Sequence, residues 1–340
     1  MAGVRTAAII GLGPMGLTHA AITAGLGRAR VVALVDSDSR LTGAGRGLLP
    51  GVDFFSDVGE MMKKATPECV YVCTPPPTHA AVVRQVIESG PPGAVFVEKP
   101  LATTGADARA LVEAARRQHV LGMVGFQKRF NGIFGEAKRR LAAGAIGRPV
   151  LFRAHDFTAG PMGPATGWRG EPGAGGATLE WGIHLLDLLL WLFGPPAAIQ
   201  ARRHRIYSDR VEDFASVSAK FGGSVAGFVE IGWNTRNYAP PDLSIEVVGT
   251  DGVLQLNEDR LIQYSGSDGS KAVAGRTPPE MLHVTQLTRN PPFLLGQPEN
   301  VWEEVGFHDA LDRGSAPPNS WEDSVVLLEW IDQIRHAPLE

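Results

Sequence analysis

A glycine-rich turn between an apolar strand and a helix constrains this chain more than any other feature. In the segment TAAIIGLGPMG, residues 6–16, the strand runs directly into Gly11, Gly13 and Gly16, and a helical pattern follows. Gly11 permits the tight turn, Gly13 lets the backbone approach a pyrophosphate, and Gly16 lets helix and strand pack closely. The N-terminus of the helix offers N–H groups to phosphates. The sequence therefore predicts a dinucleotide-binding loop, and its expected members are Gly11, Leu12, Gly13, Pro14, Met15 and Gly16.

An acidic residue stands where a bound ribose would need it. Asp36 ends the second apolar strand, VVALVD, and follows Gly16 by 20 residues. A carboxylate there can accept a hydrogen bond from a ribose 2′-OH and would repel a 2′-phosphate. The next residue is Ser37 and not a basic one, so we predict NAD as the preferred cofactor. Arg40 is near enough in sequence to leave NADP as an alternative.

Short apolar strands alternate with amphipathic helices in the first third of the chain. The expected strands cover residues 6–10, 31–36, 69–75, 94–100 and 120–126, and the expected helices cover residues 15–26, 79–90 and 106–119. Continuous apolar strands separated by helices indicate a parallel sheet covered on both faces. We therefore predict a doubly wound α/β domain over residues 1–124, which would bind the dinucleotide.

The pattern changes after about residue 125. Residues 214–221, FASVSAKF, alternate between apolar and polar, and residues 243–249 repeat the alternation. Period two over several runs indicates a largely antiparallel sheet with one face buried. A loop rich in Gly and Pro is expected at residues 158–176, and a helix with a capping-type start at Ser320 and Asp323 near the end. We predict an α+β substrate domain with an open sheet over residues 125–340.

Composition excludes several classes of protein. A chain of 340 residues is too long for one ordinary core, which favours two domains. The net charge of -4 gives no basic field for a nucleic acid or an anionic membrane. The longest apolar run, residues 185–193, is too short to span a bilayer and contains Asp187. The first residues lack a signal-peptide pattern, so we expect a cytoplasmic protein.

The two cysteines, Cys69 and Cys73, fall in an expected buried strand. Small core residues in a reducing compartment account for them, and no second pair exists to complete a zinc site. We therefore expect no metal.

The ends of two expected strands carry polar residues. In a parallel sheet the ligand crevice lies at the carboxyl ends of the strands. VEKPL places Glu98 and Lys99 at such an end, and the residue before a proline is pushed toward extended backbone, so Lys99 should project from the strand. A cation there could stabilise a developing alkoxide. We expect the cofactor to be bordered by Thr74, Pro75, His79, Glu98 and Lys99, although His79 alone fits a packing or capping role better.

One apolar helix carries three ionisable side chains on one face. In GGATLEWGIHLLD, residues 175–187, a helical step of about 100° brings Glu180, His184 and Asp187 within roughly one sixth of a turn. An imidazole with an unperturbed pKa of about 6.5 suits a general base near neutral pH.

These segments occur in an order that resembles the Gfo/Idh/MocA family, the glucose–fructose oxidoreductase and inositol dehydrogenase group. The resemblance covers nearly the whole chain and rests on GLGPMG, CTPPPTH, VEKPL, VGFQKRF, GWRGEPGAGGATLEWGIHLLD and LSIEVVGTDGVLQL. It implies a Rossmann domain followed by an α/β domain whose open sheet often carries dimer or tetramer contacts. It also implies NAD(P)-linked oxidation or reduction of a hydroxyl on a sugar, cyclitol or related polyol.

The resemblance also assigns residues. The lysine of the family's EKP motif maps onto Lys99, near nicotinamide and substrate, and the family's histidine maps onto His184. The acid four residues earlier is usually Asp and is Glu180 here, which leaves open whether it orients the imidazole or reaches the substrate. Asp187 could equally be a cap or an ion pair beneath the pocket. The expected substrate-binding residues are Lys99, Gln127, Arg129, Trp168, Arg169, Glu180, His184 and Asp187.

Hydride transfer needs a group that takes the hydroxyl proton and a group that stabilises the oxyanion. We hypothesise that His184 is the general acid or base, that Lys99 hydrogen-bonds the same oxygen, and that Glu180 orients His184. In the alternative, Lys99 is the base.

Two other functions remain open from the sequence. The same scaffold can host an NAD-dependent glycosidase or isomerase that oxidises its substrate transiently. A non-catalytic nucleotide sensor would be expected to lack Lys99 and His184, and both are present. Six other histidines show no partner pattern, and we interpret them as structural or exposed: His19, His119, His155, His204, His283 and His308.

Overall fold

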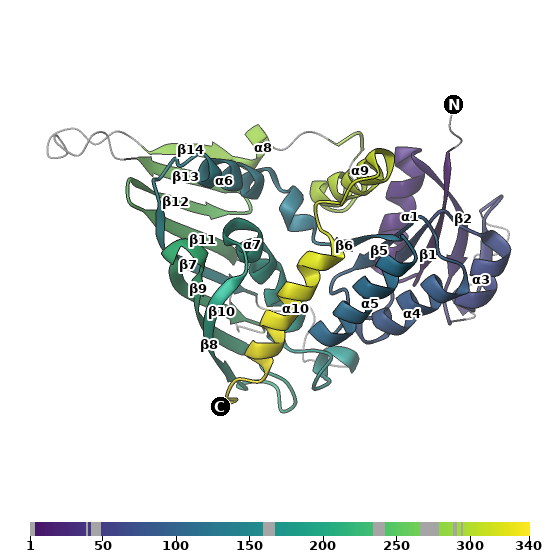
Figure 1. The fold of residues 1–340 in the computed structure, drawn as a ribbon, viewed down its shortest axis with the longest axis horizontal. Coiled ribbons are helices and arrows are strands. Elements are labelled where there is room, and N and C mark those ends of the chain that lie inside the picture. The colour runs from purple at the N-terminus through teal and green to yellow at the C-terminus, as the bar shows by residue number, and fades with distance from the viewer. Residues whose placement is uncertain are drawn as a thin grey trace, which may run out of the picture. The chain divides into compact units, whose positions relative to one another are not determined.

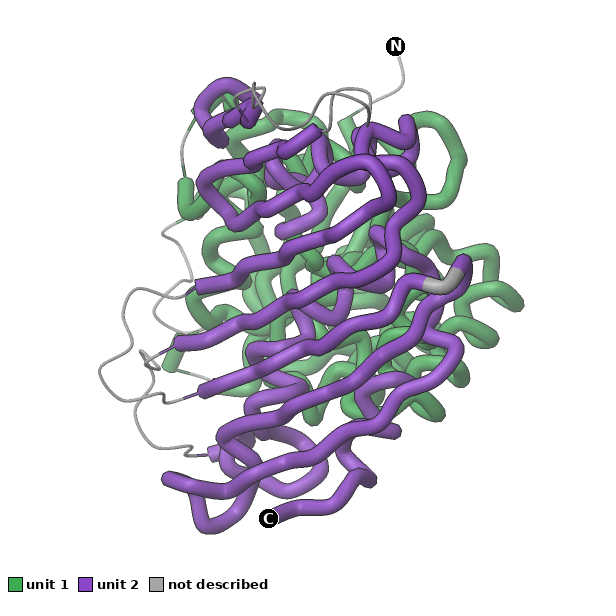
Figure 2. The backbone as a smooth tube through the Cα atoms, turned by 90° about the vertical axis from the view of Figure 1, so that its left-hand side faces the viewer, with its two compact units in different colours: residues 1–127, 290–329 green, residues 128–289, 330–340 purple. Residues whose placement is uncertain are grey.

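The structure is a computed structural model of the chain. It describes residues 4–38, 40–41, 49–158, 167–233, 242–265, 279–287, 291–293 and 295–340, so that residues 159–166 of the predicted glycine-rich loop lie outside the described part. By spatial proximity the chain forms two compact units, drawn in two colours in Figure 2. Unit 1 comprises Met1–Gln127 and Asn290–Glu329, and unit 2 comprises Lys128–Arg289 and Trp330–Glu340. The domain boundary between residues 124 and 125 stays a prediction, and residues 290–329 group in space with the N-terminal sheet.

Unit 1 is built on a six-stranded sheet in the order β3-β2-β1-β4-β5-β6, with every neighbouring pair parallel. The strands are β1 (Arg5–Ile10), β2 (Ala29–Val35), β3 (Asp53–Phe55), β4 (Cys69–Val72), β5 (Ala94–Glu98) and β6 (Leu121–Gly125). The order of the strands reverses between β1 and β4, which is where doubly wound sheets open a ligand crevice at their carboxyl ends. The predicted doubly wound domain is confirmed.

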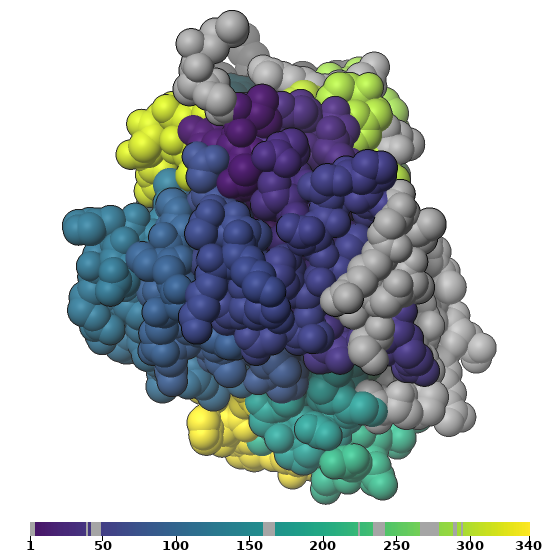
Figure 3. Space-filling model, turned by 90° about the vertical axis from the view of Figure 1, so that its right-hand side faces the viewer, coloured from purple at the N-terminus to yellow at the C-terminus, as the bar shows by residue number. Residues whose placement is uncertain are grey.

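Helices cover both faces of this sheet (Figure 1). In that view α3, α4 and α5 follow one face, and α1 and α9 lie on the other. Their bounds are α1 (Pro14–Leu26), α3 (Val58–Ala65), α4 (Pro76–Ser89), α5 (Gly105–Arg117) and α9 (Pro298–Arg313). Because both faces are covered, all four residues of β4 are buried, which explains why these strands have continuous apolar sequences. The residues from β1 to α5, purple to blue in Figure 3, form one continuous surface.

The sequence analysis did not predict α9. The buried residues of this helix include Glu299, Glu303, Glu304 and His308 beside Val301 and Phe307. Buried acids break the apolar period by which an amphipathic helix is recognised. The helix therefore escapes a search for apolar stripes although it belongs to the core of unit 1.

Unit 2 is built on an eight-stranded sheet in the order β14-β13-β12-β11-β7-β10-β9-β8. Only the β7–β10 pair is parallel among the pairs that the structure describes, so the predicted mainly antiparallel sheet is confirmed. The strands are β7 (Pro149–Phe157), β8 (Pro196–His204), β9 (Phe214–Phe221), β10 (Ala226–Gly232), β11 (Asp242–Gly249), β12 (Gly252–Asn257), β13 (Arg260–Ser265) and β14 (Glu280–His283).

The two faces of this sheet differ. Ala215, Val217, Ala219 and Phe221 of β9 are buried, and the residues between them are exposed, as the period of two predicts. The buried face packs against helices and an aromatic cluster in which Phe221 lies 5.6 Å from Trp330, between ring centroids. No helix of unit 2 covers the opposite face in the described part of the chain (Figure 2). The helices of this unit include α6 (Gly132–Ala142), α7 (Ile183–Phe193) and α8 (Val284–Leu287).

The last helix, α10 (Trp321–Arg335), begins as predicted, since the backbone N–H of Asp323 donates to Ser320 Oγ at 3.3 Å. None of the helices among the described residues is both long and apolar enough to cross a bilayer.

Candidate active site

Two glycines of the N-terminal loop stand where no other residue would fit. Gly11 has a φ of 93°, and a Cβ there would lie 2.7 Å from the main chain of Cys73 and Thr74. A Cβ on Gly16 would lie 1.8 Å from the carbonyl oxygen of Gly11. Gly13 differs, because no atom lies within 4 Å of a Cβ placed on it. The space before the N-terminus of α1 is therefore open to a ligand, and a pyrophosphate fits such a position.

The Asp36 carboxylate joins this loop to the end of β2. Its Oδ2 accepts from the backbone N–H of Leu12 at 2.7 Å, and its Oδ1 accepts from that of Asp38 at 2.8 Å. Arg40 donates to Asp38 Oδ2 at 2.7 Å and is 89% exposed in its side chain. Ser37 is exposed. The hydrogen-bonding groups at the end of β2 thus fit an adenosine ribose. The two carboxylates, of Asp36 and Asp38, exceed in charge the one guanidinium, of Arg40.

His79 connects two loops of unit 1. Its Nδ1 lies 2.6 Å from the carbonyl oxygen of Pro100, and its Nε2 lies 2.6 Å from that of Thr74. Burial lowers the pKa of this imidazole. The ring positions the loop after β4, with Thr74 and Pro75, against the loop after β5. Direct contact of His79 with a cofactor stays a prediction.

Glu98 is the last residue of β5 and Lys99 follows it directly, so both stand at the carboxyl end of the strand as expected. The backbone N–H of Lys99 donates to Glu98 Oε2 at 3.1 Å, and Glu98 Oε1 lies 2.8 Å from Nε2 of His19. The other ring nitrogen of His19 lies 2.6 Å from Glu304 Oε1. His19 is therefore buried and structural, which is one of the two alternatives expected for it. Its partners lie 79 and 285 residues away in sequence, and no local pattern could have indicated them.

In unit 2 the glycine pair before the predicted helix permits two close contacts. A Cβ on Gly175 would lie 1.8 Å from the carbonyl oxygen of Arg169. Gly176 has a φ of 100°, and its Cβ would lie 2.5 Å from Glu212 Oε1. The same carboxylate oxygen accepts from the backbone N–H of Thr178 at 3.2 Å. These contacts fix the start of the segment that carries Glu180.

The predicted regular α-helix is wrong for its first turn. Thr178–Gly182 is a π-helix, and the α-helix α7 begins only at Ile183. A Cβ on Gly182 would lie 2.4 Å from Ile231 Cδ1, and Trp181 Nε1 donates to Asp156 Oδ1 at 2.6 Å, so β10 and β7 both hold this turn. A wider turn changes the angular step assumed for Glu180, and such turns recur at functional sites.

The predicted substrate residues of unit 2 form two groups. In the first, the Arg169 guanidinium lies 4.5 Å from the centroid of the Trp168 ring, and its Nε donates to Glu180 Oε1 at 3.3 Å. In the second, Arg129 donates to Asp187 through Nε at 2.9 Å and through Nη2 at 2.6 Å. Both side chains of the second group are buried, which favours the ion-pair interpretation of Asp187. Substrate contact by either residue stays a prediction.

His184 is buried in the first turn of α7. Gln127 is half-buried and is the first residue of a 3₁₀ turn, Gln127–Phe130; it belongs to unit 1, whereas the rest of the turn belongs to unit 2. Orientation of His184 by Glu180 stays a prediction.

Sequence reasoning missed Asp156. It points to the buried face of β7 with Phe152 and Ala154, and its side chain is 2% exposed. Burial raises the pKa of this carboxyl to about 7, although the hydrogen bond from Trp181 acts in the opposite direction. The signal was available, because an acid at an inward position of an alternating strand is unusual.

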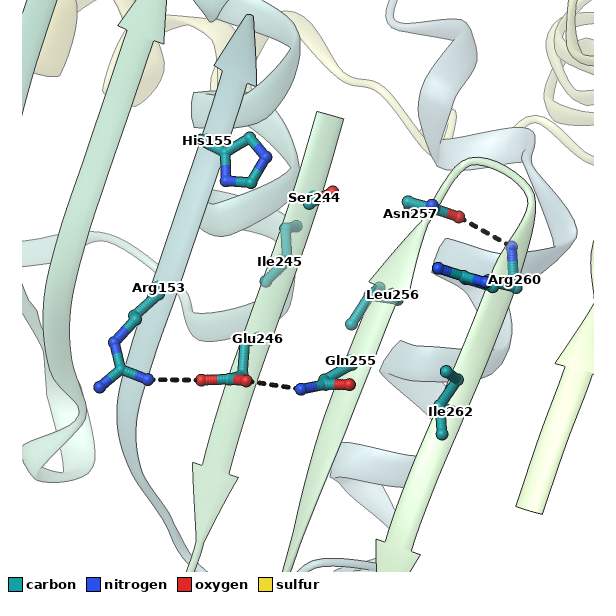
Figure 4. Close-up of a pocket in the computed structure, with 10 residues that line it drawn as sticks. All are labelled: Arg153, His155, Ser244, Ile245, Glu246, Gln255, Leu256, Asn257, Arg260 and Ile262. Atoms are coloured by element: carbon teal, nitrogen blue, oxygen red, sulfur yellow. Dashed lines mark hydrogen bonds and ion pairs between the residues drawn. The ribbon is translucent and has the colours of Figure 1, made fainter. Parts of the chain in front are cut away.

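A pocket on the uncovered face of the eight-stranded sheet lies apart from the predicted catalytic residues, none of which lines it. Figure 4 shows its side chains rising from four neighbouring strands, with Glu246 between Arg153 at 2.6 Å and Gln255 at 2.7 Å. Among the described residues, no group of His, Cys, Asp and Glu is arranged to hold a metal ion.

Two family models match the chain. A model described as an oxidoreductase family with an NAD-binding Rossmann fold matches residues 5–126, and one described as a GFO/IDH/MocA C-terminal domain matches residues 134–255.

Individual proteins are similar over most of the chain. D-apiose dehydrogenase of Paraburkholderia graminis is 30% identical over 335 residues, which cover 96% of this chain and 85% of that enzyme. The scyllo-inositol 2-dehydrogenase (NAD(+)) of Bacillus subtilis is 29% identical over 254 residues, or 72% of this chain and 71% of that enzyme. A solved structure of levoglucosan dehydrogenase in complex with NADH has a TM-score of 0.82 at 23% identity, covering 97% of this chain and 95% of that one.

The raised pKa of Asp156 predicts how stability depends on pH. The folded protein holds this proton up to about pH 7, whereas the unfolded chain releases it near the ordinary value of 3.8. Between these values the folded state binds more protons, so this group makes the free energy of unfolding fall as pH rises. Asp156→Asn removes that dependence and keeps an acceptor for Trp181. The difference in the free energy of unfolding between the variant and the wild type should therefore shift in favour of the variant as the pH rises from about 4 to about 7, and should stay constant above about pH 7.

Urea unfolding at several pH values across this range measures the difference. Asp209→Asn, at an exposed aspartate, is the matched control for loss of one charge. A difference between Asp156→Asn and wild type that stays constant from pH 4 to 7 would contradict the raised pKa.

Proposed function

The chain belongs to the GFO/IDH/MocA family of oxidoreductases, and on this premise we propose that it transfers a hydride between NAD and a hydroxyl or keto carbon of a sugar, cyclitol or related polyol. The observation that carries the proposal is unit 1, where the loop through Gly11 and Gly16, the tethered Asp36 and Lys99 follow the carboxyl ends of β1, β2 and β5 in one parallel sheet. Two of its relatives, an apiose dehydrogenase and an inositol dehydrogenase, support the substrate class.

The cofactor would be held by residues of unit 1. The open space at Gly13 and the N-terminus of α1 suit the pyrophosphate, and Asp36 suits the ribose hydroxyls. When bound, the nicotinamide supplies the acceptor or donor of the hydride. We infer a preference for NAD over NADP, because Asp36 and Asp38 would repel a 2′-phosphate and Arg40 is engaged by Asp38.

Proton transfer is assigned to side chains of this chain. We propose that His184 takes or returns the proton of the reacting hydroxyl and that the Lys99 ammonium hydrogen-bonds the same oxygen and favours its anionic form. Glu180 stands on the same segment as His184 and is hydrogen-bonded to Arg169. It would fix the polar surroundings of the imidazole, while Arg169 and Trp168 would contact the polyol.

Two substitutions separate the roles of His184 and Lys99. In a panel of cyclitols, free sugars and sugar nucleotides with NAD⁺ and NADP⁺, we expect absorbance of the reduced nicotinamide to appear with at least one polyol. With that polyol His184→Ala should lower kcat by about 10²–10⁴-fold, because general acid–base catalysis contributes that much. Lys99→Met should lower it as well.

Exposed residues supply the matched controls, His283→Ala and Lys63→Met. Near-wild-type turnover of His184→Ala together with loss of activity in Lys99→Met would reassign the base to Lys99. Absence of any nicotinamide signal alongside cleavage of a nitrophenyl glycoside would overturn the dehydrogenase proposal.

Cofactor preference is tested at the end of β2. Asp36→Ala should raise the Kd for NADH by roughly 10–100-fold, since it removes a charge-assisted hydrogen bond worth about 1.5–3 kcal/mol. Asp38→Ala should leave NADH binding nearly unchanged and strengthen NADPH binding, because it releases Arg40. Fluorescence titration with both dinucleotides gives the ratio. If that ratio is the same in wild type and both variants, the carboxylates do not set the preference.

We further propose that the uncovered face of the eight-stranded sheet binds a second copy of this chain in a homodimer or homotetramer. The neighbouring strands β7 and β10 expose Leu151 at 50% and Phe228 at 64% of their surface. Large apolar side chains exposed on two adjacent strands are suited to an interface with another chain. Arg153 and Glu246 lie beside it and offer charges of both signs, which a twofold axis can pair.

Phe228→Arg tests this interface. A buried arginine without a partner is costly in an interface, so the variant should have a smaller mass in solution than wild type by light scattering. The control is Val4→Arg, because Val4 is an exposed apolar residue of unit 1 that directly precedes β1. This variant should keep the mass of the wild type. A monomeric wild-type protein would contradict the proposal.

We also infer a cytoplasmic location. Cys69 and Cys73 are free thiols, which is usual in a reducing compartment.

A further inference from the structure

Unit 1 contains a buried chain of ionisable groups that the chemistry proposed above does not use. His19 of α1 lies between Glu98 at the end of β5 and Glu304 of α9, with N–O distances of 2.8 Å and 2.6 Å. The side chains of His19 and Glu304 are fully buried, and that of Glu98 is 14% exposed. Three elements that are distant in sequence therefore meet at one imidazole.

The hydrogen-bond partners fix the protonation of this imidazole. Glu98 Oε2 accepts from the backbone N–H of Lys99, and Glu304 Oε2 accepts from the Tyr71 hydroxyl at 2.6 Å. Each carboxylate thus uses its second oxygen as an acceptor, as an ionised carboxylate does. Both ring nitrogens of His19 face the remaining oxygens of these carboxylates, and two ionised carboxylates require a donor at each nitrogen. Only the imidazolium has two N–H groups.

Electrostatics agrees with this count. Burial by itself lowers the pKa of His19, but the hydrogen bonds and charges of Glu304 and Glu98 outweigh it and raise the pKa to about 10. Burial raises the pKa of Glu98, yet His19 outweighs that effect and the pKa lies below its usual value. The pair is therefore charged throughout the neutral range.

The surrounding groups leave the cluster nearly balanced in charge. Two carboxylates and one imidazolium sum to one negative charge, and the Lys99 ammonium interacts favourably with Glu98. Tyr71 of β4 and Cys73, which follows that strand, stay neutral, because burial raises the pKa of both. The titratable or charged groups around the cluster include Cys69 and Tyr71 of β4, Cys73 just after it, Glu98 at the end of β5, Lys99 just after it, and Glu303, Glu304 and His308 of α9.

We propose that His19 is a permanently protonated positioning residue. As an imidazolium it keeps Glu98 ionised and oriented, and Glu98 in turn holds the main chain of Lys99 at the point where that lysine leaves β5. His19 also stands on the helix whose N-terminus forms the dinucleotide loop, so the same ring ties the loop's helix to the lysine's strand. This inference rests on the proposed catalytic role of Lys99.

The protonation state is measured without reference to activity. In protein labelled with ¹⁵N-histidine, both ring nitrogens of His19 should keep imidazolium shifts from pH 6 to pH 9, with the signal assigned by its loss in His19→Gln. In Glu304→Gln the pKa of His19 should fall, since one of its two anionic partners is gone. A neutral-tautomer shift of His19 at pH 8 in the wild type would overturn the proposal.

Kinetics tests the positioning. His19→Gln should lower kcat by roughly 10–100-fold, the size expected when a catalytic group is displaced by about 1 Å. Without the cation, two adjacent carboxylates no longer stay ionised together, so kcat should gain a pH dependence near neutrality. The double variant His19→Gln/Glu304→Gln removes one of these carboxylates and should recover part of kcat and the original pH profile. Glu303→Gln, at a neighbouring buried acid of α9 hydrogen-bonded to Asn319, is the matched control.

The outcomes separate the two proposals. If Lys99→Met keeps full activity, the proposed role of Lys99 fails while the nitrogen shifts still report on His19. If Lys99→Met is inactive but His19→Gln keeps the wild-type kcat and pH profile, the positioning inference alone fails. If His19→Gln does not fold, Glu304→Gln provides both the shift and the kinetic comparison, and an unchanged kcat and unchanged His19 pKa there would overturn the inference.

Discussion

The rest of this structure depends on backbone segments that approach each other more closely than any side chain would allow. In unit 1 a Cβ on Gly16 would lie 1.8 Å from the carbonyl of Gly11, and in unit 2 a Cβ on Gly175 would lie 1.8 Å from the carbonyl of Arg169. The first approach packs α1 against β1 and leaves the helix N-terminus open. The second fixes the start of the segment that carries Glu180 and His184. In each unit, therefore, a backbone approach that only glycine permits determines where the neighbouring polar groups lie.

The features that could be predicted from the sequence are the local ones. A glycine turn after an apolar strand, an acid at the next strand end and a period of two are encoded within a few residues, so the doubly wound sheet, the open antiparallel sheet and the family all followed. The long-range groupings could not be predicted. His19 meets Glu304 across 285 residues, and α9 joins the core of unit 1 with a face of buried acids that no apolar pattern marks.

The candidate site shows the same limit in finer detail. Residues 175–187 were correctly expected to carry a helix, but its first turn is π-helical because β7 and β10 hold Trp181 and Gly182 from outside the segment. The sequence also did not indicate which of the predicted residues pair with each other. Arg129 donates to Asp187, whereas Arg169 lies over the Trp168 ring and donates to Glu180. Glu180 accepts a hydrogen bond from Arg169 Nε at 3.3 Å, in the turn that precedes His184.

In the proposed reaction a hydride passes directly between a polyol carbon and the nicotinamide, and the oxidation states of both change. The most direct measurement follows that hydrogen with a polyol deuterated on its carbinol carbons. Direct hydride transfer should leave one deuterium in each NADH formed, found by mass spectrometry of the dinucleotide, together with one equivalent of ketone. Return of the deuterium to the carbon skeleton of substrate or product, with no accumulation of labelled NADH, would rule out a net dehydrogenase and identify transient oxidation.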